Sequence, residues 1–224
     1  MAAELDGPRL APRSGAARQL VVFLHGYGAD GNDLIDIGGQ WQALLPDAAF
    51  VSPHAHEPLP GAPFGRQWFG LTFRVPGERW RGVEAARPVL DAFLDRELAS
   101  HGLTDRDLAL VGFSQGTMMA LHTGLRRKAA LAGIVGYSGI LVTPEDEPPT
   151  AMAADLGPRP PVLLVHGDQD PVIPPEALAF SVEGLRALDV PVKAHMSRGI
   201  GHGIDGVGLR LGAEFLVEVF GRAA

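Results

Sequence analysis

Short apolar runs recur along the chain, and they predict β-strands. Most of the runs lack an alternation of apolar and polar positions, which is typical of strands buried on both faces of a mainly parallel sheet. The runs are Gln19–His25, Ala48–Ser52, Leu108–Gly112, Leu131–Tyr137, Pro161–His166 and Val190–Met196.

Between these runs, apolar residues at three- and four-residue spacing predict helices over Gly82–His101, Gln115–Arg127, Glu176–Leu188 and Val207–Phe220. Alternating strands and helices predict an α/β fold, with a mostly parallel central sheet and helices on both faces. An antiparallel hairpin over Arg9–Leu24 is expected to add to one edge of this sheet.

Two segments do not fit the alternation. Pro53–Trp80 is rich in proline, glycine and aromatic residues, and Val142–Pro161 is rich in proline and acidic residues. Neither is long or polar enough to separate two domains, so we expect one domain over residues 1–224 with no large lid domain. Both segments are expected to lie above the carboxyl edge of the sheet, where open α/β folds bind their ligands.

The composition narrows the class of protein further. At 46% hydrophobic and 20% charged residues, the chain has the composition of an ordinary soluble domain. Its formal net charge of −7 argues against a nucleic-acid or anionic membrane partner. The absence of cysteine excludes disulfides, cysteine-ligated zinc and a cysteine nucleophile. With neither a signal-peptide pattern nor a membrane-spanning apolar stretch, a cytoplasmic location is expected.

The clearest chemical motif is Gly112-Phe113-Ser114-Gln115-Gly116, a G-x-S-x-G sequence between a predicted strand and a predicted helix. A sharp strand-to-helix turn at this place projects the serine hydroxyl clear of the sheet. The start of the following helix also stabilises negative charge. Ser114 is therefore the candidate nucleophile.

A serine hydroxyl needs a base that a third group orients. Among the eight histidines, His202 lies in a glycine-rich loop between the last predicted strand and the last predicted helix. It is the best candidate, because His25 and His166 end buried runs and His195 lies inside a strand. A metal site is not expected at the isolated pair His54 and His56, since no third ligand is in view.

The orienting acid is expected between the serine and the histidine in chain order. The sequence VLLVHGDQDPVIP places Asp168 and Asp170 directly after a buried strand. We favour Asp170, which Pro171 fixes, and keep Asp168 as the second candidate.

The early segment HGYGADG admits two interpretations. Gly26, Gly28 and Gly31 match a dinucleotide-binding fingerprint, but that motif calls for an acidic residue about 20 positions later, where this chain reads FVSPHAH. A helix should also begin within the motif, whereas we expect a loop through Gly39. The alternative is a loop whose backbone N–H groups stabilise an oxyanion, and this interpretation fits better.

Four motifs together, LHGYGAD, GFSQG, HGDQDPVIP and GIGHGID, resemble the phospholipase/carboxylesterase family. The likeness runs from about Leu20 to Phe220 and includes PFGRQWF. It implies an α/β-hydrolase fold, a small-molecule ester or thioester substrate, no metal and no cofactor. Thr117 departs from the family, which usually has glycine there, and YSGIL departs where relatives often carry tryptophan.

By this resemblance, Ser114 is the nucleophile, Asp170 the acid and His202 the base, and the backbone N–H groups of Tyr27 and Gln115 form the oxyanion hole. The expected activity is hydrolysis of short- to medium-chain carboxylic esters through an acyl-enzyme. Acyl-protein thioesterase or lysophospholipase activity is an alternative, as is a catalytically inactive binding protein of the same fold. A homodimer is left open.

Aromatic residues crowd into the loop after the second predicted strand. They have two interpretations: they pin the loop on the core, or some of them wall the acyl site. In the second interpretation, Trp68 and Phe69 bind the acyl chain of the substrate. The cluster comprises Phe64, Trp68, Phe69, Leu71 and Phe73.

Overall fold

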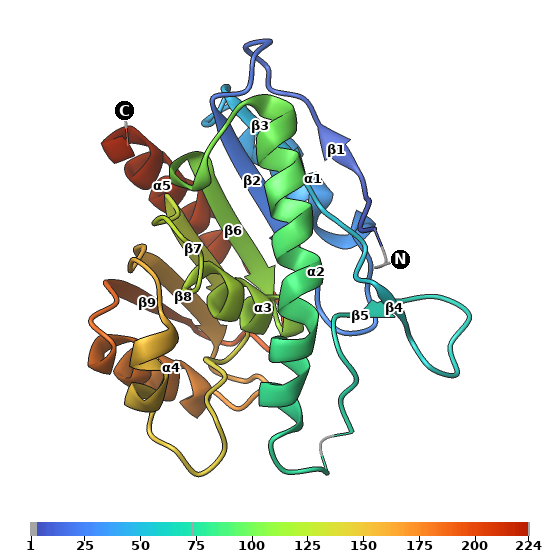
Figure 1. Ribbon diagram of the computed structural model, residues 1–224, viewed down its shortest axis with the longest axis vertical. Helices are drawn as coiled ribbons and strands as arrows, with labels where there is room; N and C mark the ends of the chain where they lie inside the picture. The colour runs from blue at the N-terminus through green and yellow to red at the C-terminus, as the bar shows by residue number, and fades with distance from the viewer. Residues whose placement is uncertain (1–3, 73, 224) are drawn as a thin grey trace.

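The computed structural model describes residues 4–72 and 74–223. A seven-stranded sheet runs through it in the order β1-β3-β2-β6-β7-β8-β9 (Figure 1). Every neighbouring pair in this sheet is parallel except β1 with β3, which confirms the predicted α/β class. The strands are β1 (Arg9–Leu10), β2 (Gln19–Leu24), β3 (Ala48–Val51), β6 (Leu108–Phe113), β7 (Gly133–Tyr137), β8 (Val162–Gly167) and β9 (Val192–Ser197).

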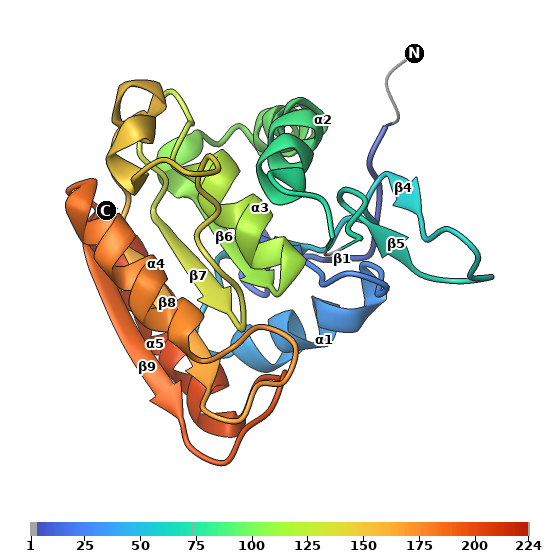
Figure 2. The ribbon, with the colours of Figure 1, turned by 90° about the horizontal axis from the view of Figure 1, so that it is seen from below.

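Helices cover both faces of the sheet (Figures 1 and 2). The apolar side chains that face α2, α3 and α4 form one buried cluster, and those that face α1 and α5 form a second. The central strands are therefore buried on both sides, which explains their uninterrupted apolar sequence. The helices are α1 (Asn32–Trp41), α2 (Glu78–His101), α3 (Gln115–Gly124), α4 (Glu176–Ala187) and α5 (Gly206–Ala223).

Helix α1 contradicts the loop expected through Gly39. It begins directly after Gly31 and buries Leu34, Ile35 and Trp41 against the sheet. Glycines in a helix weaken its intrinsic propensity, which is why the segment suggested a loop. Gly38 packs closely on β3, because a Cβ there would approach the Phe50 ring to 3.0 Å, which is tighter than an ordinary van der Waals contact. Packing against β3 decides the structure of this segment, not local propensity.

The expected hairpin over Arg9–Leu24 is also wrong. Strand β1 is antiparallel and lies at the edge of the sheet, but its partner is β3, with Arg9 opposite Val51. Both sides of β2 are occupied, since it pairs in parallel with β3 and with β6. The free side of β3 is therefore the place where β1 adds.

The two segments outside the alternation meet at one end of the molecule. The first contains the short strands β4 (Glu57–Pro58) and β5 (Arg66–Gln67), which pair antiparallel. The second contains a 3₁₀ helix, η2 (Pro149–Asp155). Another 3₁₀ helix, η1 (Asp105–Asp107), lies outside both segments and precedes β6. A Cβ on Gly77 of the first segment would lie 2.9 Å from a carboxylate oxygen of Glu145 in the second. Phe73, part of the expected aromatic cluster, lies outside the described residues.

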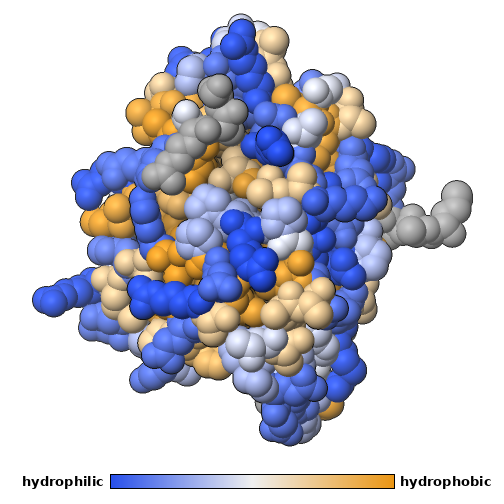
Figure 3. All heavy atoms as spheres, turned by 60° about the vertical axis from the view of Figure 1, so that its left-hand side comes forward, coloured by the Kyte–Doolittle hydropathy of each residue, from blue (hydrophilic) through white to orange (hydrophobic). Residues whose placement is uncertain are grey.

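The other edge of the sheet is strand β9, where Lys193, Ala194 and Met196 are exposed. Figure 3 shows the side of the molecule that lies on the left in Figure 1, and hydrophobic residues form separate patches between hydrophilic ones there. The homodimer that the sequence left open stays a prediction.

Candidate active site

Ser114 lies in the sharp turn between β6 and α3. Its backbone has φ 53° and ψ −115°, a conformation that costs free energy for a residue with a side chain. The turn is possible because Gly112 and Gly116 bracket it: a Cβ on Gly116 would collide with the Leu24 carbonyl, and one on Gly112 would collide with Gly116. The Ser114 N–H donates to the Tyr137 carbonyl at 2.9 Å, so β7 holds the turn in place.

His202 lies in the loop between β9 and α5, beside Ser114. Its Nδ1 is 2.7 Å from Asp170 Oδ2, and its Nε2 is 3.0 Å from Ser114 Oγ. A carboxylate only accepts hydrogen bonds, so Nδ1 carries the proton and Nε2 is left to accept the serine hydroxyl. The imidazole also packs on the Phe113 ring, with 5.0 Å between centroids.

Asp170, which follows β8, is 5% exposed. Its Oδ1 accepts the N–H groups of Val172 at 2.8 Å and Ile173 at 2.9 Å, which leaves Oδ2 for His202. Burial raises the pKa of Asp170, but the hydrogen bonds from His202 and the two backbone N–H groups outweigh it, and the pKa lies below its ordinary value. The ionised form of the carboxylate is thus favoured beside the His202 imidazole.

Asp168, the second candidate for the acid, points elsewhere. It is exposed, and its Oδ1 accepts the Gly199 N–H at 2.6 Å. His195, an alternative base, lies on β9 opposite Val165 in the strand pairing. His166 is 3.3 Å from the Asp170 carboxylate, but its Nε2 is 2.9 Å from the Ile173 carbonyl, where it holds the loop.

The backbone N–H groups of Tyr27 and Gln115 are the expected oxyanion hole. Among the residues that the structure describes, no acceptor is found for either of them. The loop after β2 approaches Ser114 closely, because a Cβ on Gly26 would be 3.4 Å from the Ser114 Cβ. Unpaired backbone N–H donors close to a serine hydroxyl are what an oxyanion requires, and the role of these two N–H groups as an oxyanion hole stays a prediction.

Trp68 and Phe69 are buried, at 1% and 4% exposure, and belong to the larger core cluster. The Trp68 indole N–H donates to the His25 carbonyl at 2.9 Å. Phe69 lies against α2, where a Cβ on Gly82 would collide with its ring. These contacts fit a loop pinned on the core, and an acyl-binding role for the two residues stays a prediction.

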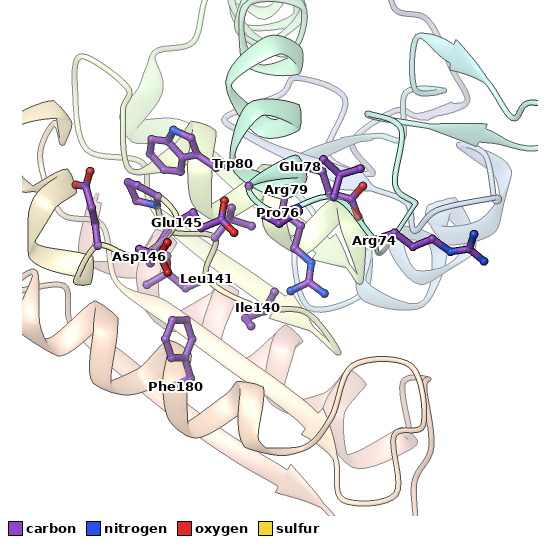
Figure 4. A pocket seen from close by; sticks show the side chains of 16 residues that line it. Arg74, Pro76, Glu78, Arg79, Trp80, Ile140, Leu141, Glu145, Asp146 and Phe180 are labelled. Atoms are coloured by element: carbon purple, nitrogen blue, oxygen red, sulfur yellow. The ribbon is translucent and has the colours of Figure 1, made fainter.

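The sequence did not predict a cavity of about 660 Å³, which lies between the two segments outside the strand–helix alternation (Figure 4). Residues 74–80 line one side and residues 140–147 another, and Phe180 of α4 faces Trp80 across it. Ile140 places one end of the cavity near Ser114, because the preceding Gly139 packs on the Ser114 backbone. No local pattern could have revealed this cavity, since its walls come from distant parts of the chain.

Thr117, the departure from the family's glycine, supports the turn. Its Oγ1 is 2.8 Å from the Gly112 carbonyl and 2.9 Å from the Tyr137 carbonyl. A Cβ on Gly136 would approach the Thr117 methyl group to 2.6 Å, so the side chain fills the space above β7. The sequence did not suggest a role for Ser138. Its hydroxyl donates to the carbonyl of Gly203, the residue after His202, at 3.1 Å and so helps to hold the loop that carries His202.

The mostly parallel sheet and the strand-to-helix turn at Ser114 define a serine hydrolase of the α/β-hydrolase fold. The chain belongs to the phospholipase/carboxylesterase family, whose model matches residues 5–219. The resemblance found in the sequence is confirmed. Among the described residues, no helix is both long and apolar enough to cross a bilayer.

Known esterases and a known thioesterase are similar to the chain over most of its length. Esterase YpfH of Escherichia coli is 28% identical over 89% of this chain and 82% of its own. Acyl-protein thioesterase 1 of Gibberella zeae is 26% identical over 87% of this chain and 88% of its own. The crystal structure of esterase PE8 is 44% identical, with a TM-score of 0.90 over 96% of this chain and 99% of that one.

Proposed function

We propose that the chain hydrolyses short- to medium-chain carboxylic esters through an acyl-enzyme, with Ser114 as nucleophile, His202 as base and Asp170 as the orienting acid. The observation that carries the proposal is the continuous hydrogen-bonded series from Asp170 through His202 to Ser114, at 2.7 and 3.0 Å. The similarity to esterases over nearly the whole chain supports it.

The geometry supports the following steps. His202 Nε2 takes the hydroxyl proton as Ser114 Oγ attacks the ester carbonyl carbon, and Asp170 stabilises the imidazolium that forms. The tetrahedral oxyanion accepts hydrogen bonds from the N–H groups of Tyr27 and Gln115, each worth about 2.7–4 kcal/mol by comparison with a protease. His202 then protonates the leaving alcohol, and a water molecule attacks the acyl-enzyme with His202 as base again.

The cavity beside Ile140 offers a place for the acyl chain. Its inner wall carries Ile140, Leu141 and Val142, and Phe180 adds an exposed aromatic ring. Each buried methylene contributes about 0.8 kcal/mol, so such a wall favours medium acyl chains over acetate. A wall formed by Trp68 and Phe69 is the competing proposal, and their contacts with the core support it less.

A thioester or a lysophospholipid is the alternative substrate, because the same three side chains can attack any activated acyl carbonyl. The similarity to acyl-protein thioesterase 1 favours the thioester among these. An inactive binding protein is disfavoured, because none of the three side chains is replaced and their hydrogen bonds are intact. The cytoplasmic location stays a prediction.

The test has two parts. A fluorophosphonate should add one adduct to the intact mass of the protein, mapped to Ser114, and Ser114→Ala should not react. Rates on p-nitrophenyl esters and acyl thioesters of increasing chain length should then show which acyl group and leaving group are preferred. An adduct on any other serine would refute the assignment of the nucleophile.

A further inference from the structure

The two halves of the proposed oxyanion hole come from distant parts of the chain, and a third segment joins them. Tyr27 follows β2, and Gln115 begins α3. The segment Arg66–Phe69, which includes β5, makes hydrogen bonds to both halves through its backbone and one side chain. Its position therefore couples the two N–H donors to each other.

On one side, the Gln115 side chain binds this segment. Its Oε1 accepts the Trp68 N–H at 2.9 Å, and its Nε2 donates to the Phe69 carbonyl at 2.7 Å. Gln115 is 1% exposed, so these two backbone groups take the place of water as partners of the amide. The residue whose backbone N–H faces the oxyanion is thus held through its own side chain.

On the other side, the segment binds the loop after β2. The Arg66 carbonyl accepts the Gly28 N–H at 2.8 Å, and the Arg66 N–H donates to the Ala29 carbonyl at 2.8 Å. The Trp68 indole N–H donates to the His25 carbonyl at 2.9 Å. These three bonds fix the loop on both sides of Tyr27.

The His25 ring sets the direction of the Tyr27 N–H. His25 Nε2 accepts the Ala55 N–H at 3.0 Å, so Nδ1 carries the proton and donates to the Gly26 carbonyl at 2.8 Å. That carbonyl and the Tyr27 N–H belong to one planar peptide group, so fixing the first fixes the second. Burial lowers the pKa of His25 to about 4, which keeps Nε2 an acceptor at neutral pH.

We propose that the Gln115 side chain and the His25 ring are positioning residues that hold the Tyr27 and Gln115 N–H groups at the spacing the oxyanion requires. The Gln115 side chain acts through segment Arg66–Phe69, and the His25 ring acts through the Gly26 carbonyl. This inference rests on the proposed function. Oxyanion donors act only within about 2.7–3.1 Å of the developing charge, and a misplacement of about 1 Å can cost about 100-fold in rate.

The experiment replaces each side chain and separates transition-state stabilisation from substrate binding. Gln115→Met keeps the length and the backbone N–H but removes both side-chain hydrogen bonds. We expect kcat on a p-nitrophenyl ester to fall about 10- to 100-fold with KM little changed. Affinity for a trifluoromethyl ketone, whose Ser114 adduct carries an oxyanion, should fall by the same factor. Gln42→Met is the matched control, since Gln42 also bonds a distant carbonyl, that of Ala11, and it should change neither value.

His25 gives an independent pair of variants. His25→Leu should lower kcat and ketone affinity together, and His25→Asn should restore part of both, because its amide can still donate to the Gly26 carbonyl. Should Gln115→Met fail to fold, Trp68→Phe replaces it, since it removes only the indole N–H and some ring volume.

The outcomes separate this inference from the function on which it rests. Unchanged kcat and ketone affinity in folded variants would overturn the inference, as would a loss confined to KM or to the melting temperature. If the unaltered protein neither hydrolyses esters nor reacts with a fluorophosphonate at Ser114, the proposed function fails, and the inference fails with it.

Discussion

Replacing Asp170 by asparagine tests the chemistry of the site without changing its shape. Aspartate and asparagine are nearly isosteric, so the substitution exchanges one carboxylate oxygen for an amide group. The structure determines which oxygen is exchanged. Oδ1 accepts two backbone N–H groups, from Val172 and Ile173, and an amide NH₂ in that position would face two donors. The asparagine oxygen therefore stays there, and Nδ2 faces His202.

The consequence is a change of tautomer. An N–H donor placed 2.7 Å from His202 Nδ1 makes that nitrogen the acceptor, so the ring proton moves to Nε2. Nε2–H then points at Ser114 Oγ, 3.0 Å away, and cannot accept the hydroxyl proton. The base is lost although every side chain is still in place.

The corresponding change in a serine protease costs about 10⁴ in kcat, which is about 5.4 kcal/mol at 1.36 kcal/mol for each tenfold change. We expect Asp170→Asn to lower kcat on a p-nitrophenyl ester by this factor. The melting temperature should stay within a few degrees of that of the unaltered protein. Asp168→Asn is the matched control: its carboxylate bonds the Gly199 N–H, and the loss should stay below about tenfold. A reversed order of the two effects would refute the assignment of the acid.

Three further predictions concern the base, the pH dependence of stability and the packing. Ester hydrolysis should be nearly lost in His202→Ala, because the imidazole is the group that takes the Ser114 hydroxyl proton; if this variant kept substantial activity, another histidine would be the base. Burial lowers the pKa of His25 from 6.5 to about 4. On acidification, the unfolded chain therefore binds a proton at this histidine at a higher pH than the folded protein does. As a result, the free energy of unfolding should drop by about 3 kcal/mol as the pH falls from 6.5 to 4. In His25→Asn, the free energy of unfolding measured by urea titration should lack this contribution to the pH dependence. If it depended on pH as steeply as in the unaltered protein, His25 would not be neutral and buried in the folded state. Trp68→Ala should lower the free energy of unfolding by about 3–5 kcal/mol, because the ring is fully buried. It should also slow the hydrolysis of acetate and octanoate esters by the same factor. A loss of activity on octanoate alone, in a protein with an unchanged melting temperature, would instead support a role of Trp68 in binding the acyl chain.

Features that depend on local sequence were predictable. The central strands are buried on both faces, so their apolar runs are uninterrupted and their positions agree with the structure within a few residues. The turn at Ser114 was predictable because Gly112 and Gly116 must lack side chains for the chain to pass. Gly102 directly follows the helix predicted over Gly82–His101, and it ends α2 with φ 66°, a conformation that favours glycine.

Features that depend on distant contacts were not predictable. Helix α1 carries two glycines, and the close packing of one of them, Gly38, on the Phe50 ring of β3 depends on a contact that the local sequence does not show. The partner of β1 depends on which strand edge is free after the sheet has formed. The bonds from Gln115 to Trp68 and Phe69 join positions 47 and 46 residues apart, and nothing in GFSQG indicates where its glutamine side chain will bind.

The wide separation of the site residues in the chain has a consequence for folding. Ser114 and His202 are 88 residues apart, and Asp170 and His202 are 32 residues apart. Contacts of such long range form late and slowly, because the entropy of closing large loops must be overcome before they are made. A chain that has collapsed without completing β8, β9 and their loops would carry the serine but not its base. The rate at which Ser114 gains reactivity toward a fluorophosphonate during refolding would therefore report completion of the native sheet.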